Sequence, residues 1–197
     1  MGVDQELAQT TAQSAGNEVK PGRNIIFWGL NKDHCSVAVV GLGKKVKDKD
    51  DIELIHLEKD AVRIAASGGC RALDAAGVKN IEVEDFSDPE SAAEGSILGT
   101  WKFQEYKKKK DVLPKVSIFD PNEDSSSKWL QGAIKAEAQN VARKLADTPS
   151  NLLTPTILAN EVQNVLSPLG IEVQVHEKKW AEDQKMFSFF KCSQRFH

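Results

Sequence analysis

The residues of this 197-residue chain that could do chemistry are few and lie far apart along the sequence. The first candidate is the turn Gly41-x-Gly43-Lys44-Lys45, which follows an apolar run ending at Val40. Glycine-rich turns after strands can present backbone N–H groups to a phosphate. The third glycine of a dinucleotide fingerprint is missing, as is the Gly-Lys-Ser/Thr ending of a nucleotide loop, and a charged loop follows. A tight turn is therefore favoured, with a phosphate site as the alternative.

A second candidate is the neighbouring pair His34-Cys35, which could supply a base and a nucleophile. Such a pair also needs a third group that orients the base, and adjacent residues of a strand point to opposite faces. We therefore expect a packed thiol and a surface imidazole. The other histidines, His56, His176 and His197, are isolated, and no HExxH motif occurs.

Charged clusters offer the remaining candidates. The acidic pairs Asp50-Asp51 and Glu84-Asp85 could hold a metal, but they fall in a loop and at a strand end, where solvated carboxylates are usual. The basic run Lys107–Lys110 is flanked by acidic residues, which favours a solubilising loop over a binding patch. The residues by themselves therefore assign no catalytic, cofactor-binding or metal-binding position.

Composition narrows the class of protein. Hydrophobic residues make up 40% of the chain and charged residues 28%, as in a soluble globular protein, and the formal net charge of −3 predicts no nucleic-acid or anionic-membrane partner. No apolar run approaches the ~20 residues of a membrane span. The start of the chain is acidic and contains no Arg before Arg23, unlike a secretory or mitochondrial leader. Three scattered cysteines indicate reduced thiols, so we expect a cytoplasmic protein.

Strands and helices alternate along the chain, which predicts an α/β fold with a mainly parallel or mixed sheet flanked by helices. Strands are expected over residues 23–30, 35–43, 79–86, 115–120 and 171–176. Helices are expected over 51–76, 87–101, 127–146, 155–169 and 178–186. Residues 121–127 should form a polar loop.

The helical spacing of apolar residues predicts which faces are buried. The first helix should bury Ile55, Val62, Ala66, Gly69 and Leu73, and the second a stripe of Ala93, Ile97 and Trp101. The long third helix should bury Leu130, Ile134, Ala138, Val141 and Leu145. The next should bury Leu158, Val162, Val165, Leu166 and Leu169.

Residues at the helix ends match known capping patterns. Ser87 and Glu90 have the spacing of a capping box, and Gly77 suits the end of the preceding helix. Thr154 and Pro155 should begin the helix after a break at residues 148–154.

These elements suggest five regions. Residues 1–22 form a polar arm, 23–125 an amino-terminal α/β domain, and 126–147 an interdomain helix. Residues 148–186 begin a second domain, and 187–197 form a tail. A lone helix and strand cannot bury a core, so we expect the second domain to be cut short.

The hinge between these domains carries a motif. It consists of Asn140, Arg143, Leu145, Thr148, Pro149, Asn151, Thr154, Pro155 and Ala159. This pattern resembles the interdomain segment of the leucine aminopeptidases, which are cytosolic two-metal enzymes. The stretches FWGL, VAVVGLGKK, AASGGCRAL, AAEGSILGTWKF and VQVHEKKWAEDQKM resemble animal members in the same order, so the resemblance covers roughly residues 21–186.

The resemblance implies an amino-terminal domain similar to a macro domain, without the chemistry. It implies a catalytic domain whose Lys, Asp and Glu residues bind two divalent ions, zinc, manganese or magnesium, which activate a water that attacks the first peptide bond. Members form homohexamers. The catalytic signature Asn-Thr-Asp-Ala-Glu-Gly-Arg is absent from the 197 residues, and the tail after Met186 departs from the family pattern. No catalytic residue or metal ligand is therefore carried over, and whether the chain is itself an enzyme stays open.

Three hypotheses follow. The chain is an aminopeptidase-like protein that is inactive alone. Alternatively, it is an assembly or regulatory module that associates with itself or with full-length subunits, using an apolar patch of Trp180, Phe187, Phe189 and Phe190. The third is a phosphate or nucleotide binder, by analogy with macro domains and the Gly41-x-Gly43 turn.

Overall fold

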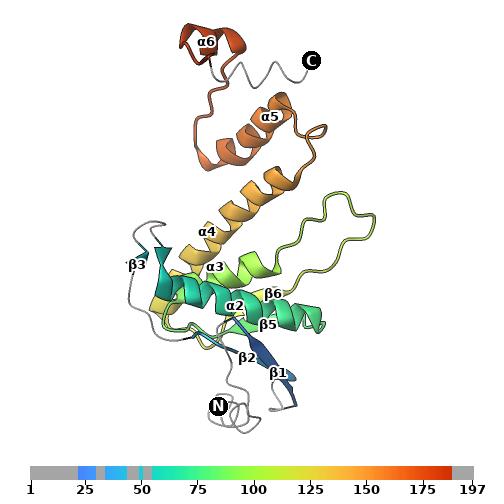
Figure 1. The fold of residues 1–197 in the computed structure, drawn as a ribbon, viewed down its shortest axis with the longest axis vertical. Helices are drawn as coiled ribbons and strands as arrows, with labels where there is room; N and C mark the ends of the chain where they lie inside the picture. Colours follow the sequence, from blue (N-terminus) through green and yellow to red (C-terminus); the bar gives the residue numbers. More distant parts are fainter. Residues whose placement is uncertain (1–21, 30–33, 44–48, 51–54, 188–197) are drawn as a thin grey trace. The chain divides into compact units, whose positions relative to one another are not determined.

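The computed structural model describes residues 22–29, 34–43, 49–50 and 55–187, which Figure 1 draws in colour. The chain divides into two compact units, Met1–Lys144 and Leu145–His197. The predicted arm, apart from Gly22, and the predicted tail after Phe187 lie outside the described residues.

The strands of the first unit form pairs. β1 (Asn24–Trp28) runs antiparallel to β2 (Ser36–Val40), β3 (Lys49–Asp50) runs antiparallel to β4 (Ile55–His56), and β5 (Asn80–Val83) runs parallel to β6 (Lys115–Ile118). The α/β class is confirmed. Among the described residues, however, the strands form three separate two-stranded sheets in place of one mixed sheet.

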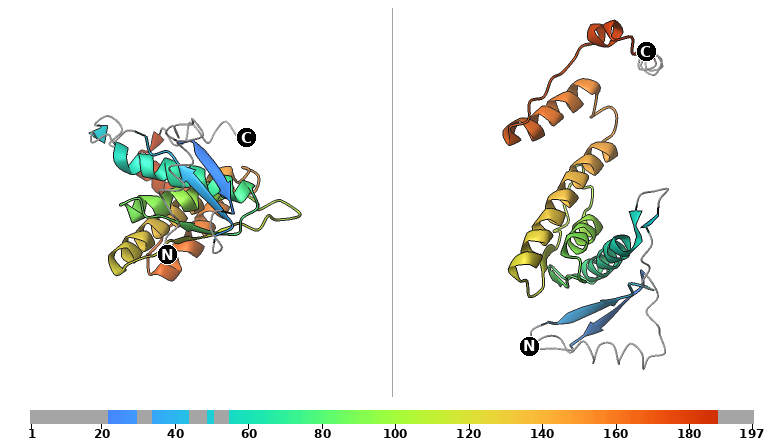
Figure 2. Two further views of the ribbon diagram at one scale, coloured as in Figure 1. Left: turned by 90° about the horizontal axis from the view of Figure 1, so that it is seen from below. Right: turned by 90° about the vertical axis from the view of Figure 1, so that its left-hand side faces the viewer.

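Three helices accompany these strands. They are α2 (Leu57–Ala75), α3 (Pro89–Thr100) and α4 (Glu123–Asp147). Figure 2 shows α3 between α2 and α4, with the β1–β2 hairpin on the other side of α2. α2 begins at Leu57, later than predicted, because Ile55 and His56 belong to the short β3–β4 ladder.

Glycines allow α3 to lie this close to both neighbours. A Cβ added at Gly95 or Gly99 would overlap α2 at Arg63 or Ser67, and one added at Gly132 of α4 would overlap the Glu90 carbonyl of α3. As a result α3 is buried around most of its circumference, from Ser91 to Ser96 and again at Thr100. The predicted single stripe of Ala93, Ile97 and Trp101 is therefore wrong, since Ile97 and Trp101 are only half-buried.

The buried face of α2 was predicted correctly for Val62, Ala66, Gly69 and Leu73. The core consists of Val62, Ala66, Cys70, Leu73, Ile81, Val83 and Ala92. The partly buried residues Ile26, Ala38, Val116 and Trp129 pack against it. α2 ends at Ala75, and Gly77 follows with a φ of +89°, as expected for a glycine after a helix.

The first turns of α3 and α4 differ from prediction. Asp88, and not Ser87, caps α3, because its carboxylate accepts a hydrogen bond from the Ser91 N–H at 3.3 Å while Ser87 has a φ of +62°. α4 starts at Glu123, within the predicted loop, because Asn122 and Ser125 exchange hydrogen bonds of 2.8 and 2.9 Å.

The predicted buried stripe of α4 is also wrong. Leu130 is 60% exposed and Ile134 62%, and Ala138 and Val141 are exposed as well. The buried residues are Ser125, Gly132, Ala136 and Asn140. The stripe of small residues faces α3 because only small side chains permit the close approach at Gly132.

The second unit contains α5 (Pro155–Leu166), the 3₁₀ turn η1 (Ser167–Leu169) and α6 (Lys178–Asp183). The Thr154 hydroxyl caps α5 through the Ile157 N–H at 3.4 Å, as predicted. No residue of α5 is buried, so its predicted apolar face is not covered within the described part of this unit. Residues 171–176 do not form the predicted strand, because a strand needs a neighbour to accept its hydrogen bonds and the described residues of the unit supply none.

None of the helices in the described residues is long and apolar enough to span a bilayer.

Candidate functional site

The Gly41-x-Gly43 turn continues the pairing of the first hairpin. The Gly41 N–H donates to the Arg23 carbonyl at 3.0 Å, and the Gly41 carbonyl accepts from the Gly22 N–H at 3.0 Å. Gly43 has a φ of +81°, which suits the favoured tight turn. Because the Gly41 N–H already has a partner, it is not available to a phosphate. Lys44 and Lys45 lie outside the described residues.

His34 is directed toward Glu82 of β5, with 3.2 Å between its Nε2 and the Glu82 Oε2, and its ring meets Phe119 edge-on. The predicted packed thiol is wrong, whereas the predicted surface imidazole holds in part, since 30% of the His34 side chain is exposed. Cys35 is exposed, whereas His34 is half-buried and its Nδ1 is buried without a hydrogen-bond partner in the described structure. No pattern in the sequence points to Glu82 as a partner of His34. Glu82 is an exposed residue on a strand that lies far from His34 in the sequence.

Of the two acidic pairs, only Glu84-Asp85 lies within the described residues with its side chains. Asp85 accepts a hydrogen bond from the Ser87 N–H at 2.8 Å and so shapes the turn before α3, and Glu84 is exposed. The side chains of Asp50 and Asp51 lie outside the described part. Within the described residues, no three His, Cys, Asp or Glu side chains lie close enough to hold a metal ion. These residues therefore do not fit a two-metal centre.

The basic run projects into solvent in a long loop between α3 and β6. Lys107–Lys110 are all exposed, and Lys107 lies 3.2 Å from Asp111, so the ion pair lowers the pKa of Asp111. The loop is closed by Gln104, whose amide exchanges hydrogen bonds with the backbone of Asp111.

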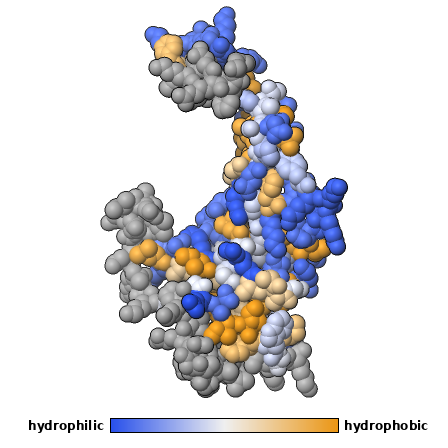
Figure 3. Space-filling view, turned by 45° about the vertical axis from the view of Figure 1, so that its right-hand side comes forward, coloured by the Kyte–Doolittle hydropathy of each residue, from blue (hydrophilic) through white to orange (hydrophobic). Residues whose placement is uncertain are grey.

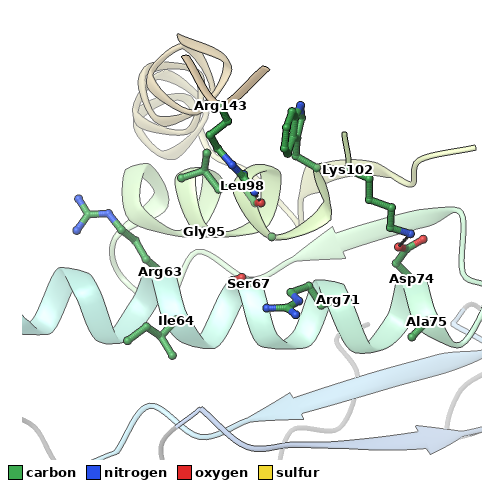
Figure 4. A pocket seen from close by; sticks show the side chains of 12 residues that line it. Arg63, Ile64, Ser67, Arg71, Asp74, Ala75, Gly95, Leu98, Lys102 and Arg143 are labelled. Carbon is green, nitrogen blue, oxygen red and sulfur yellow. Dashed lines mark hydrogen bonds and ion pairs between the residues drawn. The ribbon is translucent and has the colours of Figure 1, made fainter. Parts of the chain in front are cut away.

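A groove of about 680 Å³ runs between α2 and α3 and is the best candidate for a binding site in the described structure (Figure 4). Its cationic lining residues are Arg63, Arg71, Lys102 and Arg143, and its acidic one is Asp74. Arg63 pairs with Glu94, which is 4% exposed. Lys102 pairs with Asp74 at 2.6 Å.

Arg143, from the hinge motif, closes one side of this groove. Its Nη1 donates to the Leu98 carbonyl at 2.9 Å and to the Asn140 side chain at 3.2 Å, and the guanidinium lies 4.3 Å from the centre of the Trp101 ring. It thereby satisfies a carbonyl in the last turn of α3 and fastens α4 to that helix. Two positions of the hinge motif, Asn140 and Arg143, thus have a structural explanation.

Sequence reasoning did not find this groove. Arg63, Ser67, Arg71 and Asp74 follow one another at steps of three or four along α2, a spacing that does reveal a common polar helix face. Nothing in the sequence, however, shows that Arg143 approaches the same face across α3.

The arrangement of the chain is known from other proteins. A family model described as the amino-terminal domain of the cytosol aminopeptidase family matches residues 5–110, and one for the catalytic domain of the same family matches residues 140–195. The cytosol aminopeptidase of the pig, Sus scrofa, is 37% identical over 177 residues, which cover 89% of this chain and 34% of the pig protein.

The chain belongs to the cytosol aminopeptidase family. The resemblance inferred from the hinge motif is therefore confirmed. The chain spans about a third of the length of the pig protein, 34%.

Solved structures of two enzymes share the fold. A tomato leucine aminopeptidase variant superimposes with a TM-score of 0.69 at 19% identity, over 92% of this chain and 38% of the tomato chain. The bottromycin maturation enzyme BotP gives a TM-score of 0.65 at 22% identity, over 82% of this chain and 35% of its own. At these identities the structures support the fold.

Proposed function

We propose that this chain serves as the amino-terminal domain and interdomain helix of a cytosol aminopeptidase-type protein in the cytoplasm, and that its 197 residues do not hydrolyse peptides by themselves. The observation that carries this proposal is the extent of the two family matches. The first covers residues 5–110 and the second begins at residue 140, within α4.

The family's chemistry supports the second half of the proposal. The resemblance places the two metals and their Lys, Asp and Glu ligands in segments of the catalytic domain that have no counterpart in this sequence. BotP, which shares the fold, has been solved in complex with manganese. The described residues of this chain contain no group of three His, Cys, Asp or Glu side chains that could hold a metal ion. Hydrolysis would therefore need metal ligands from residues other than these.

The test is an assay of the purified chain on a leucyl chromogenic amide, with and without added manganese or zinc. We expect release of chromophore at the rate of the buffer control. Porcine cytosol aminopeptidase in the same buffers serves as the positive control for substrate and metal. Metal-dependent turnover that copurifies with the chain through two chromatographic steps would contradict the proposal, as would two tightly bound divalent ions per chain.

A second candidate function is assembly with itself or with full-length aminopeptidase subunits. The apolar stripe of α4, which consists of Leu130, Ile134, Ala138 and Val141, supports it because this stripe is exposed within the first unit. On the face shown in Figure 3, apolar side chains reach the surface in separate patches among hydrophilic ones. Trp180 and Phe187 of the second unit are also exposed, whereas Phe189 and Phe190 lie outside the described residues. Exposed apolar patches frequently mark contact surfaces.

Co-expression with a full-length family member, followed by size-exclusion chromatography, tests this function. We expect co-elution for the unchanged chain and separate elution for Ile134→Glu. Gln139→Glu adds the same charge on an exposed position of the same helix and should leave co-elution intact. Separate elution of the unchanged chain at every concentration would rule out the assembly function.

A further inference from the structure

The groove between α2 and α3 contains more positive charge than the described carboxylates neutralise. The Asp74 carboxylate lies 2.6 Å from Lys102 and 3.9 Å from Lys79, and Glu94 neutralises Arg63. Arg71 has no ion pair or hydrogen bond within the described structure, and the partners of Arg143 are a neutral carbonyl, a neutral amide and an aromatic ring. Two guanidinium groups that line one groove therefore have no carboxylate partner among the described residues.

Arg143 is held in a fixed position with donors to spare. Both of its hydrogen bonds to described residues use Nη1, so the edge formed by Nε and Nη2 makes none within the described residues. That edge is the fork with which arginine holds a carboxylate or phosphate through two parallel hydrogen bonds. Because Trp101 and the Leu98 carbonyl already fix the guanidinium, little further side-chain entropy is lost on binding.

The rest of the groove suits a small ligand. Figure 4 shows Arg71 lying along α2 below α3, while Arg143 approaches α3 from the side of α4. The lining also includes Ser67, with a hydroxyl, and Gly95 and Gly99, at which α3 lies directly against Arg63 and Ser67 of α2. A volume of about 680 Å³ lies in the range of small-molecule sites.

We propose that this groove binds a small molecule through an oxyanion, either a phosphate or a carboxylate, held by Arg71 and Arg143 with the Ser67 hydroxyl beside them. The site lies in the amino-terminal domain and is independent of the metal-dependent chemistry of the family. Binding is therefore measured directly, and its failure would leave the proposed function untouched.

The test titrates the ¹⁵N-labelled full chain with inorganic pyrophosphate and, separately, with citrate, in about 0.15 M salt, where nonspecific surface attraction is largely screened. Calorimetry in the same buffer gives the affinity. We expect saturable binding of at least one probe, with the Nε–H signals of Arg71 and Arg143 shifting together. Pyrophosphate alone would indicate a phosphate ligand, and citrate alone a carboxylate ligand.

Arg71→Gln is the decisive variant, because Arg71 makes no ion pair or hydrogen bond in the described structure. We expect it to weaken binding by about tenfold or more, the effect of losing a charge-assisted hydrogen bond. Lys108→Gln removes the same charge from the exposed loop and should change affinity by less than about twofold. Equal weakening by both variants would show nonspecific attraction and overturn the proposal. The absence of saturable binding of both probes at millimolar concentration would overturn it too.

Discussion

Gly132 of α4 lies against the Glu90 carbonyl of α3 so closely that a Cβ at this position would overlap the carbonyl oxygen. This contact decides which face of α4 turns inward. It also explains why Gly132, a poor helix former, stands in the middle of a 25-residue helix. Close packing of the two helices offsets the lower helix propensity.

Gly132→Ala should therefore destabilise the protein, although alanine is the better helix former. We expect a loss of about 1–3 kcal/mol in the free energy of unfolding, as for overpacked cores, measured by urea denaturation. Gly68→Ala, within α2, is the matched control, because its added Cβ would meet only the Gly22 carbonyl oxygen at 3.6 Å and the Asn24 side chain at 3.9 Å. That variant should be neutral or stabilised by up to about 1 kcal/mol. Equal effects of the two substitutions would contradict the close approach at Gly132.

Arg143→Lys tests the clamp at the end of α3. Lysine keeps the charge but loses the planar group that stacks on Trp101 while donating to the Leu98 carbonyl. We expect a loss of about 1 kcal/mol in the free energy of unfolding and a change in tryptophan fluorescence, since Trp101 loses its neighbour. Arg71→Lys, at an arginine without such contacts in the described structure, should leave both measurements unchanged. A fully stable Arg143→Lys variant with unaltered fluorescence would argue against the clamp.

The two described cysteines should differ in reactivity. Burial raises the pKa of the Cys70 thiol to about 11, although a hydrogen bond with Ser96 partly opposes this rise. At neutral pH Cys70 is therefore a protonated thiol in the core. Cys35 is exposed. Alkylation with iodoacetamide at pH 8, followed by peptide mapping, should modify Cys35 well before Cys70. Unfolding in urea should remove the difference, and comparable rates in the folded protein would mean that Cys70 is accessible.

The ion pair between Glu90 and Lys135 should make stability depend on pH. The hydrogen bond from Lys135 lowers the pKa of Glu90 below its usual 4.5, with further attraction from Lys59. Because this pKa is lower in the folded protein, the stabilisation is present at neutral pH and above 4.5. It is lost as the pH falls through the folded-state pKa.

Glu90→Gln should accordingly lower the melting temperature at pH 7. The effect should shrink as the pH falls through the folded-state pKa of Glu90, because its side chain then becomes neutral like that of glutamine. Differential scanning calorimetry across this range measures the effect. Glu137→Gln, an exposed position on α4, should show no such pH dependence. A pH-independent effect of Glu90→Gln would indicate a packing role in place of an ion pair.

Local patterns predicted the elements well where neighbouring residues decide the structure. The strand at Asn24–Trp28, the core-facing residues of α2, and the Thr154-Pro155 start of α5 all follow from alternation, helical spacing and capping. The hinge motif from Asn140 to Ala159 identified the family, because it is a matter of residue types at fixed spacing. Residues 171–176 alternate like a strand, but alternation supplies no hydrogen-bond partner, and the segment forms no strand in the described structure.

The sequence by itself therefore determined the α/β class, most helices and strands, and membership of the aminopeptidase family. Only the tertiary structure decided that α4 turns Gly132 and Ala136 inward and leaves Leu130 and Ile134 exposed. Likewise, it alone brought Arg71 and Arg143 to one groove. The first reason is that the distance to which two helix backbones can approach decides which face of a helix is buried. The second is that charged residues of one groove come from helices that are far apart in sequence. Neither quantity is a property of any local stretch of residues.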